Sequence, residues 1–180
     1  NIGEINRATE VIGRMRALLT KGATTRQSVD VNTLVKEVLP LTRERALMQG
    51  VSVRVESGSN LPMVAADRVQ LQQVLINLMI NALDAMKNTP PAERQLTVRT
   101  SAPSPRGVQI SISDTGIGLP AGKPEAIFES FFSTKPDGMG MGLSICRSIV
   151  QAHDGRIWAV NNTDRGATFH VLLPVKSPGP

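Results

Sequence analysis

Five polar side chains form one narrow stripe on a helix that the sequence predicts from Asp67 to about Lys87. At about 100° per residue the stripe covers an arc of about 80°, and most of the remaining surface is apolar. Its members are Gln70, Gln73, Asn77, Asn81 and Asp84. A solvated face would be wider and would use Lys, Glu or Arg, because Asn and Asp are poorer helix formers. We therefore interpret the stripe as the wall of a binding cavity, with an ordinary exposed face as the alternative.

The two asparagines of this stripe are four residues apart and project their amides side by side. A carboxamide oxygen is a neutral ligand that suits Mg²⁺ when phosphates supply the negative charge and waters fill the remaining positions. We expect Asn81 to be a Mg²⁺ ligand.

A carboxylate stands at the end of a predicted strand, in the run DTGIGLP that begins at Asp114. Such a carboxylate can accept a hydrogen bond from the exocyclic amine of adenine, whereas guanine carries an acceptor oxygen at that position. Gly116 and Gly118 allow the backbone to approach a flat ring closely. The alternative interpretation is a tight turn that leaves an edge strand.

Three alternating glycines, Gly138, Gly140 and Gly142, precede a helix predicted from Leu143 to His153. The free N–H groups and the dipole of a helix N-terminus favour phosphate binding. The G-x-G-x-G spacing fits neither a Walker loop nor a dinucleotide fingerprint. A flexible hinge is the alternative.

Helices and strands interleave around these groups. Helical spacing also predicts a helix from Asp30 or Asn32 to about Met48, and alternating apolar residues predict five strands. The strands are expected at Val51–Val55, Leu96–Val98, Val108–Ile112, Gly155–Val160 and Gly166–Leu173, with the second and third forming a hairpin. The predicted fold is α+β, a two-layer α/β sandwich with a mixed sheet and three helices on one face. The glycine-rich stretch from Thr115 to Gly142 is long for a loop, and we expect it to be a lid whose base is packed by phenylalanines.

The N-terminal residues follow a different pattern. Apolar residues recur at spacings of three and four, as in an amphipathic helix that packs on another helix, namely at Ile5, Ala8, Ile12, Met15 and Leu19. A helix lying on its own domain is the alternative. Residues 22–29 lack periodicity and indicate a linker.

Composition limits the classes of protein. With 180 residues and 41% hydrophobic content, the chain suits one compact domain with a short appendage. The net charge is +5, yet the 20 Lys and Arg residues are scattered and aromatic residues are few, so no nucleic-acid partner is expected. The single cysteine, Cys146, excludes an intramolecular disulfide and suits a cytoplasmic location. No apolar run approaches the ~18 residues of a membrane span, so we expect no membrane contact by this fragment, although a longer parent could be anchored.

Five segments in this order resemble the conserved boxes of histidine-kinase catalytic domains. They read QVLINLMINALDAM, DTGIGLP, IFESFFSTK, GMGMGLSI and GATFHVLLP, and the match runs from about Asp30 to Pro174. This kinase branch belongs to the GHKL superfamily, which includes gyrase, Hsp90 and MutL. The resemblance implies that residues 1–21 are the C-terminal part of a dimerisation helix, residues 22–29 a linker and residues 30–176 the ATP-binding catalytic domain. It further implies Mg²⁺-ATP as substrate, ADP as product, a homodimeric parent and a response regulator as partner in two-component signal transduction.

The resemblance also implies roles for individual residues. Asn81 matches the Mg²⁺-ligating asparagine, and Asn77 matches the position where hydrolysing relatives carry a glutamate base. An amide cannot activate water as a carboxylate does, so the pocket is expected to preserve ATP for transfer to a protein. Asp114 matches the adenine-binding aspartate. Lys135 is expected to bring a cation to the γ-phosphate during transfer, although a solvent-facing loop lysine is an equal alternative. The catalytic candidates are thus Asn77 and Lys135.

The remaining nucleotide-binding candidates come from the same matches. The residue three after Asn81 is often Lys or Arg in other subfamilies, but here it is an acid, which puts its contact with nucleotide in doubt. The full set of expected nucleotide-binding residues is Asn77, Asn81, Asp84, Asp114, Gly116, Gly118, Lys135, Gly138, Gly140, Gly142, Leu143 and Thr168.

The histidine that would receive the phosphate is not found among these residues. His153 and His170, the two histidines of the chain, are expected to be structural. The family's acceptor lies on a dimerisation helix upstream, so this chain is expected to bind ATP without phosphorylating itself. The rival interpretations are an ATP-hydrolysing relative and a degenerate domain that only senses nucleotide and binds partners.

Overall fold

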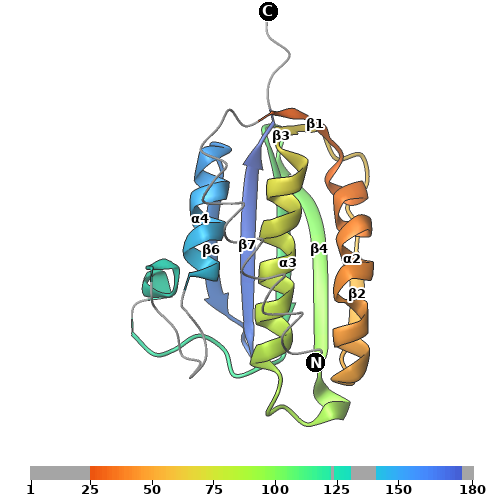
Figure 1. Ribbon diagram of the computed structural model, residues 1–180, viewed down its shortest axis with the longest axis vertical. Helices are drawn as coiled ribbons and strands as arrows, with labels where there is room; N and C mark the ends of the chain where they lie inside the picture. Colours follow the sequence, from red (N-terminus) through yellow and green to blue (C-terminus); the bar gives the residue numbers. More distant parts are fainter. Residues whose placement is uncertain (1–24, 123, 131–140, 176–180) are drawn as a thin grey trace, which may run out of the picture.

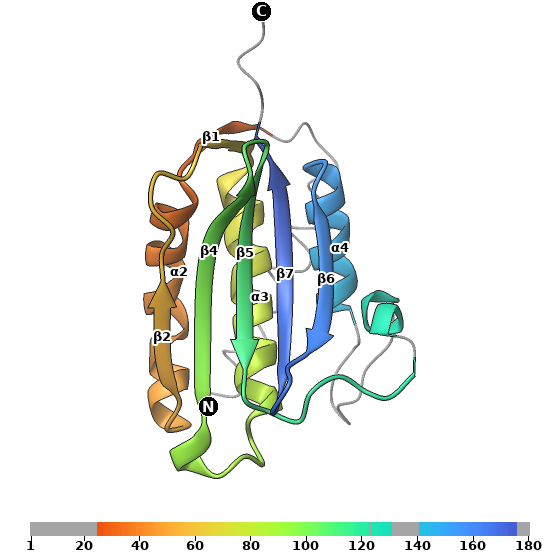
Figure 2. The same cartoon turned by 180° about the vertical axis from the view of Figure 1, so that it is seen from behind.

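The computed structural model describes residues 25–122, 124–130 and 141–175. Over these ranges three α-helices cover one face of a five-stranded sheet and the opposite face is open, which confirms the expected two-layer α+β sandwich (Figures 1 and 2). The helices are α2 (Val31–Met48), α3 (Arg68–Ala85) and α4 (Gly142–Ala152). The predicted N-terminal helix and the lid residues Lys135, Gly138 and Gly140 lie outside the described residues.

The sheet is mixed, as predicted. Its strands are β2 (Ser52–Glu56), β4 (Gln95–Ser104), β5 (Gly107–Asp114), β6 (Arg156–Asn161) and β7 (Ala167–Pro174), in the spatial order β2-β4-β5-β7-β6. β2 pairs with β4 in parallel, and the other three pairings are antiparallel. The expected hairpin is β4–β5. The central strand β5 ends at Asp114, so the sheet fixes the position of this carboxylate.

A second, two-stranded sheet was not predicted. β1 (Gln27–Val29) pairs antiparallel with β3 (Val64–Ala66), so the last residues of the predicted linker at 22–29 are a strand. Each strand has three residues, which is too short for an alternating pattern to show in the sequence. They form strands only because they pair with each other, although more than thirty residues separate them in the sequence.

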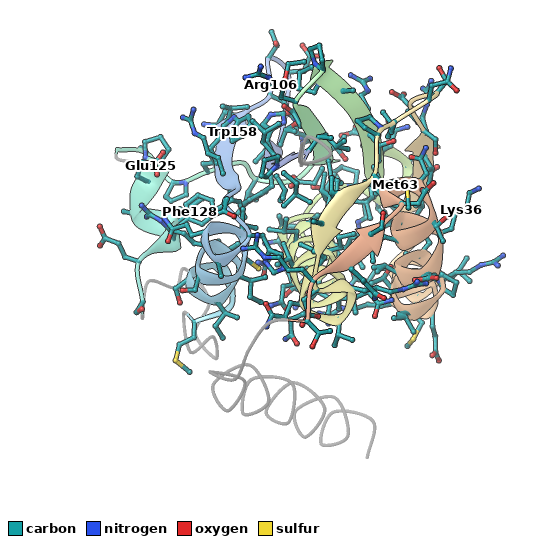
Figure 3. The ribbon with its side chains drawn as sticks, turned by 90° about the horizontal axis from the view of Figure 1, so that it is seen from above. Lys36, Met63, Arg106, Glu125, Phe128 and Trp158 are labelled. Carbon is teal, nitrogen blue, oxygen red and sulfur yellow. The ribbon has the colours of Figure 1, made fainter. Side chains whose placement is uncertain are left out.

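The hydrophobic core lies between the helices and the sheet. In the view from above, the helices lie on one side and the sheet, marked by Trp158 of β6, lies on the other (Figure 3). Buried and partly exposed residues alternate along β5, as expected for a strand with one covered face. Both long helices begin at an aspartate cap, because Asp30 accepts a hydrogen bond from the Thr33 N–H and Asp67 accepts one from the Gln70 N–H. The apolar side of α3 faces the core with Leu71, Val74, Leu75, Leu78, Met79, Ala82 and Leu83.

In the part of the chain that the structure describes, two short 3₁₀ helices lie in the connections between the main elements. One, η1 (Pro91–Glu93), precedes β4, and the other, η2 (Pro124–Phe128), lies in the stretch expected to be the lid. Phe128 is 3% exposed and meets Phe169 of β7 edge-to-face at a ring-centroid distance of 6.3 Å. This contact confirms that Phe128 packs the base of the loop against the sheet.

Candidate functional site

Asp114 is a buried carboxylate at the end of the central strand. The residue is 2% exposed, and its Oδ1 accepts hydrogen bonds from the backbone N–H of Gly116 at 2.8 Å and of Ala167 at 3.4 Å. Burial raises the pKa of Asp114, while these two hydrogen bonds act to lower it. The hydrogen bonds found to this carboxylate within the described residues both go to Oδ1, which leaves Oδ2 as an acceptor for a ligand.

Two glycines explain why the backbone closes tightly around this aspartate. A Cβ on Gly116 would lie 2.4 Å from the carbonyl oxygen of Ala85, at the C-terminus of α3. A Cβ on Gly166 would lie 2.0 Å from the carbonyl oxygen of Asp114, and Gly166 has a φ of 83°. Only glycine fits at either position. Gly116 thus packs closely against the end of α3, and its predicted approach to a ligand ring stays a prediction.

The contact at Gly116 links the aspartate to the asparagine stripe. The Ile117 N–H donates to the Ala85 carbonyl at 3.2 Å, and Ala85 is one helical turn beyond Asn81. Asp114 and the C-terminal end of α3 therefore lie next to each other, and a shared nucleotide site stays a prediction.

The other side of the stripe faces α4. The Asn77 side chain lies beside the thiol of Cys146, which is fully buried on α4 and donates to the Val74 carbonyl at 3.9 Å. Burial raises the pKa of this thiol to about 12, and the Asn77 contact acts in the opposite direction. Asn81 is intermediate in exposure and has an interaction within the chain. Asn77 therefore lies at the interface of α3 and α4, while the Mg²⁺ role of Asn81 stays a prediction.

Asp84 forms ion pairs with residues outside the stripe. Arg45 of α2 contacts its Oδ1 at 2.5 Å, and Lys87 approaches the same oxygen at 3.5 Å. The Asp84 side chain is 11% exposed. Two cations therefore gather at a position where the sequence alone shows only an acid, and the expected nucleotide contact of Asp84 stays untested.

The N-terminus of α4 begins at the last of the predicted phosphate-binding glycines. Its N-cap, Met141, makes no side-chain capping hydrogen bond, so the first N–H groups of the helix, those of Gly142 and Leu143, receive no side-chain cap from it. An N-terminus of this kind attracts anions. This arrangement is compatible with the predicted role of Gly142 and Leu143.

Gly118 and Thr168 have roles that the sequence did not indicate. Gly118 has a φ of 78° and packs against the side chain of Asn161, which accepts a hydrogen bond from the Leu119 N–H at 2.7 Å. The Thr168 hydroxyl lies 2.8 Å from Ser113 Oγ on the open face of the sheet. The structure therefore does not bring Thr168 to the Asp114 carboxylate. Its neighbour Ala167 reaches that carboxylate through the backbone, a role that no side-chain pattern could reveal.

Both histidines make internal hydrogen bonds. His153 is 2% exposed, with Nδ1 2.7 Å from the Ile149 carbonyl and Nε2 accepting from the Asp67 N–H at 2.9 Å. It thereby ties the end of α4 to the cap of α3. His170 stacks on Trp158 and lies 2.8 Å from Ser111 Oγ on the open face, where burial lowers its pKa. These contacts are those of structural histidines.

Comparison with protein families assigns the chain to a known family. The family described as "Histidine kinase-, DNA gyrase B-, and HSP90-like ATPase" matches residues 66–177, a range that includes the α3 stripe, Asp114 and the N-terminus of α4. The chain belongs to this family. It is an ATP-binding domain of the kind found in the sensor histidine kinases of two-component signalling.

Individual relatives agree with this assignment. The chain is 39% identical over 168 residues to the sensor protein FixL of Bradyrhizobium diazoefficiens, which covers 93% of this chain and 33% of the relative. It is 35% identical over 175 residues to the sensor histidine kinase TmoS of Ectopseudomonas mendocina, covering 97% of this chain and 18% of the relative. The chain thus spans about a third or less of the length of these curated relatives.

Solved structures show the same fold. The catalytic domain of histidine kinase ThkA superposes with a TM-score of 0.73 at 32% identity, covering 83% of this chain and 95% of that domain. Full-length ShkA in complex with AMPPNP gives a TM-score of 0.76 at 28% identity, covering 94% of this chain and 35% of that one. ThkA in complex with the response regulator TrrA gives 0.78 at 26% identity, covering 97% and 49%.

Proposed function

We propose that this domain binds Mg²⁺-ATP and transfers its γ-phosphoryl group to a histidine in an upstream dimerisation domain. The observation that carries the proposal is the buried Asp114 carboxylate, whose Oδ1 is held by two backbone N–H groups and whose Oδ2 is left as an acceptor. This acceptor adjoins the α3 stripe through the contact of Gly116 with Ala85. An adenine amine and a triphosphate would fit these two parts of one site.

The residues that would hold Mg²⁺ are amides rather than carboxylates. Among the described residues, no cluster of three or more His, Cys, Asp and Glu side chains could hold a metal ion. Asn81 supplies a neutral oxygen, which suits an ion whose other ligands are phosphate oxygens and water. When bound, Mg²⁺ supplies neutralisation of the phosphate charge. The donor chemistry of Asn81 therefore fits the ion, and Asn77 would line the same stripe.

The pocket itself contains no strong base at the position that precedes Asn81 by one turn. Asn77 occupies that position, and a carboxamide is too weak a base to take a proton from water. The γ-phosphoryl group is thus preserved for a nucleophile brought from outside. Lys135, Gly138 and Gly140 would complete the phosphate site, and Lys135 would stabilise the charge that develops on transfer.

The proposal extends to the longer protein. We expect residues 1–21 to end a dimerisation helix, the parent to act as a homodimer in the cytoplasm, and the phosphate to pass to a response regulator. The complex of ThkA with TrrA is a precedent for such a partner. No helix among the described residues is long and apolar enough to cross a membrane.

Two measurements test the proposal. Isothermal titration of the chain with ADP and GDP in Mg²⁺ should give clearly tighter binding of ADP, and comparable affinities would contradict the role of Asp114. A longer chain that carries the upstream helices should then take an acid-labile phosphate from γ-labelled ATP. Steady release of inorganic phosphate by the 180-residue chain would instead support an ATP-hydrolysing relative.

A further inference from the structure

Asn162 anchors the β6–β7 turn to the proposed adenine-binding aspartate from the open face of the sheet. Its Nδ2 donates to the backbone carbonyl of Asp114 at 2.9 Å and to that of Arg165 at 2.9 Å, and lies 3.2 Å from Ser113 Oγ. Its Oδ1 accepts from the Thr168 hydroxyl at 2.6 Å. One side chain thus joins the end of β5 to the turn and to the start of β7.

The turn that Asn162 anchors is the one that carries a donor to the Asp114 carboxylate. The Asn162 N–H donates to the Gly166 carbonyl at 2.9 Å, and Gly166 packs on the Asp114 carbonyl so closely that a Cβ has no room. The next residue, Ala167, places its N–H at 3.4 Å from Asp114 Oδ1. A movement of the turn would therefore move this donor and leave Oδ1 of Asp114 held only by the Gly116 N–H.

We propose that Asn162 is a positioning residue for nucleotide recognition, which holds the Asp114 carboxylate in the orientation that receives the adenine amine. Asn162 acts through the strand end and the Ala167 N–H, and it does not touch the ligand. The proposal rests on the proposed function, because it assumes that Asp114 binds adenine.

The location of Asn162 separates this role from core packing. The residue is half-buried and borders two clefts, one of about 530 Å³ on the side of Thr97 and Ser113 and one of about 460 Å³ beside Gly116 and Gly118. Its replacement removes hydrogen bonds but no buried apolar volume. The expected consequence is therefore that the Asp114 carboxylate is held less firmly, and no cavity forms in the core.

Asn32 offers a matched control at the other end of the fold. Its Nδ2 donates to the Gly58 carbonyl at 2.9 Å and its Oδ1 accepts from the Thr100 hydroxyl at 2.6 Å, the same two bonds at the same lengths as those of Asn162 to Asp114 and Thr168. Asn32→Ala therefore removes hydrogen bonds that match two of those made by Asn162, without touching Asp114. Any effect specific to nucleotide recognition should be confined to Asn162→Ala.

The experiment compares ADP with purine-riboside diphosphate, which lacks the exocyclic amine. The 180-residue wild type, Asn162→Ala and Asn32→Ala are titrated with both ligands in Mg²⁺. We expect Asn162→Ala to weaken ADP binding about tenfold and binding of the amine-free analogue less than about twofold, since the amine is the group that Asp114 recognises. Asn32→Ala should leave both affinities unchanged.

The outcomes are distinct. An equal loss for both ligands would show a general structural defect and overturn the proposal, as would unchanged ADP binding. If circular dichroism shows that Asn162→Ala is unfolded, Thr168→Val is tested in its place, because it removes the hydroxyl that lies 2.6 Å from Asn162 Oδ1 and 2.8 Å from Ser113 Oγ. This variant must then weaken ADP binding more than binding of the amine-free analogue. If the wild type binds both ligands equally, Asp114 does not recognise the adenine amine, and both the proposed adenine site and the proposed role of Asn162 are refuted.

Discussion

Replacing Asp114 with asparagine is the sharpest single test of the site. The change keeps the size and shape of the side chain, and an amide oxygen at Oδ1 can still accept from Gly116 and Ala167. It converts the opposite atom from an acceptor into a donor. An adenine amine that approaches this atom would then meet a second donor instead of a carboxylate oxygen.

The expected loss follows from one charge-assisted hydrogen bond. Such a bond contributes roughly 1.5–3 kcal/mol, which corresponds to a loss of about 10- to 150-fold in affinity for ADP. The loss of affinity lies toward the upper part of this range if the adenine amine and the new side-chain amide, both donors, are forced together. Because Asp114 is 2% exposed, water cannot enter between them.

Calorimetric titration with ADP measures the loss. Asp30→Asn is the matched control, because it makes the same charge change at the cap of α2, where asparagine caps as well as aspartate. The control should bind ADP like the wild type. Wild-type affinity in Asp114→Asn would refute the assignment of adenine recognition to this carboxylate.

The same variant has an opposite effect on stability without nucleotide. Burial raises the pKa of Asp114 above the ordinary value of about 3.9, so the folded state holds its proton more tightly than the unfolded state. This favours folding below that ordinary value, and the advantage is lost as the pH rises through it toward the raised pKa. Asp114→Asn lacks this dependence. Urea unfolding should therefore show the variant gaining stability relative to wild type from pH 4 to pH 7, and a constant difference would contradict the burial argument.

Four further outcomes are expected. Asn81→Ala should leave the circular dichroism spectrum unchanged but remove the Mg²⁺ dependence of ADP binding; an unfolded variant would make the stripe structural. Arg94→Ala should lower the free energy of unfolding by about 2–3 kcal/mol in urea titrations, since Arg94 donates to three backbone carbonyls; a change under 0.5 kcal/mol would contradict this. Incubation with γ-labelled ATP should label neither His153 nor His170, and acid-labile phosphate on either would overturn their structural role. Cys146 should resist thiol reagents at pH 8 until the domain unfolds, because burial raises its pKa to about 12; rapid native labelling would refute its burial.

The sequence determined the elements and the two halves of the candidate site. Helical and alternating patterns predicted the helices now seen at Val31–Met48, Arg68–Ala85 and Gly142–Ala152 to within a few residues, and the mixed sheet with them. The asparagine stripe and the aspartate at a strand end were visible because helical periodicity and strand termination are local properties of the chain.

Only the tertiary structure decided how these parts are held. Asp114 receives a hydrogen bond from Ala167, 53 residues away, through a backbone N–H that every residue except proline possesses. Asp84, an acid in the sequence, is joined by Arg45 from another helix. The β1–β3 pairing converted part of a predicted linker into a strand. In each case the partner is distant in the sequence and is chosen by packing of the two layers, and local periodicity carries no information about such pairings.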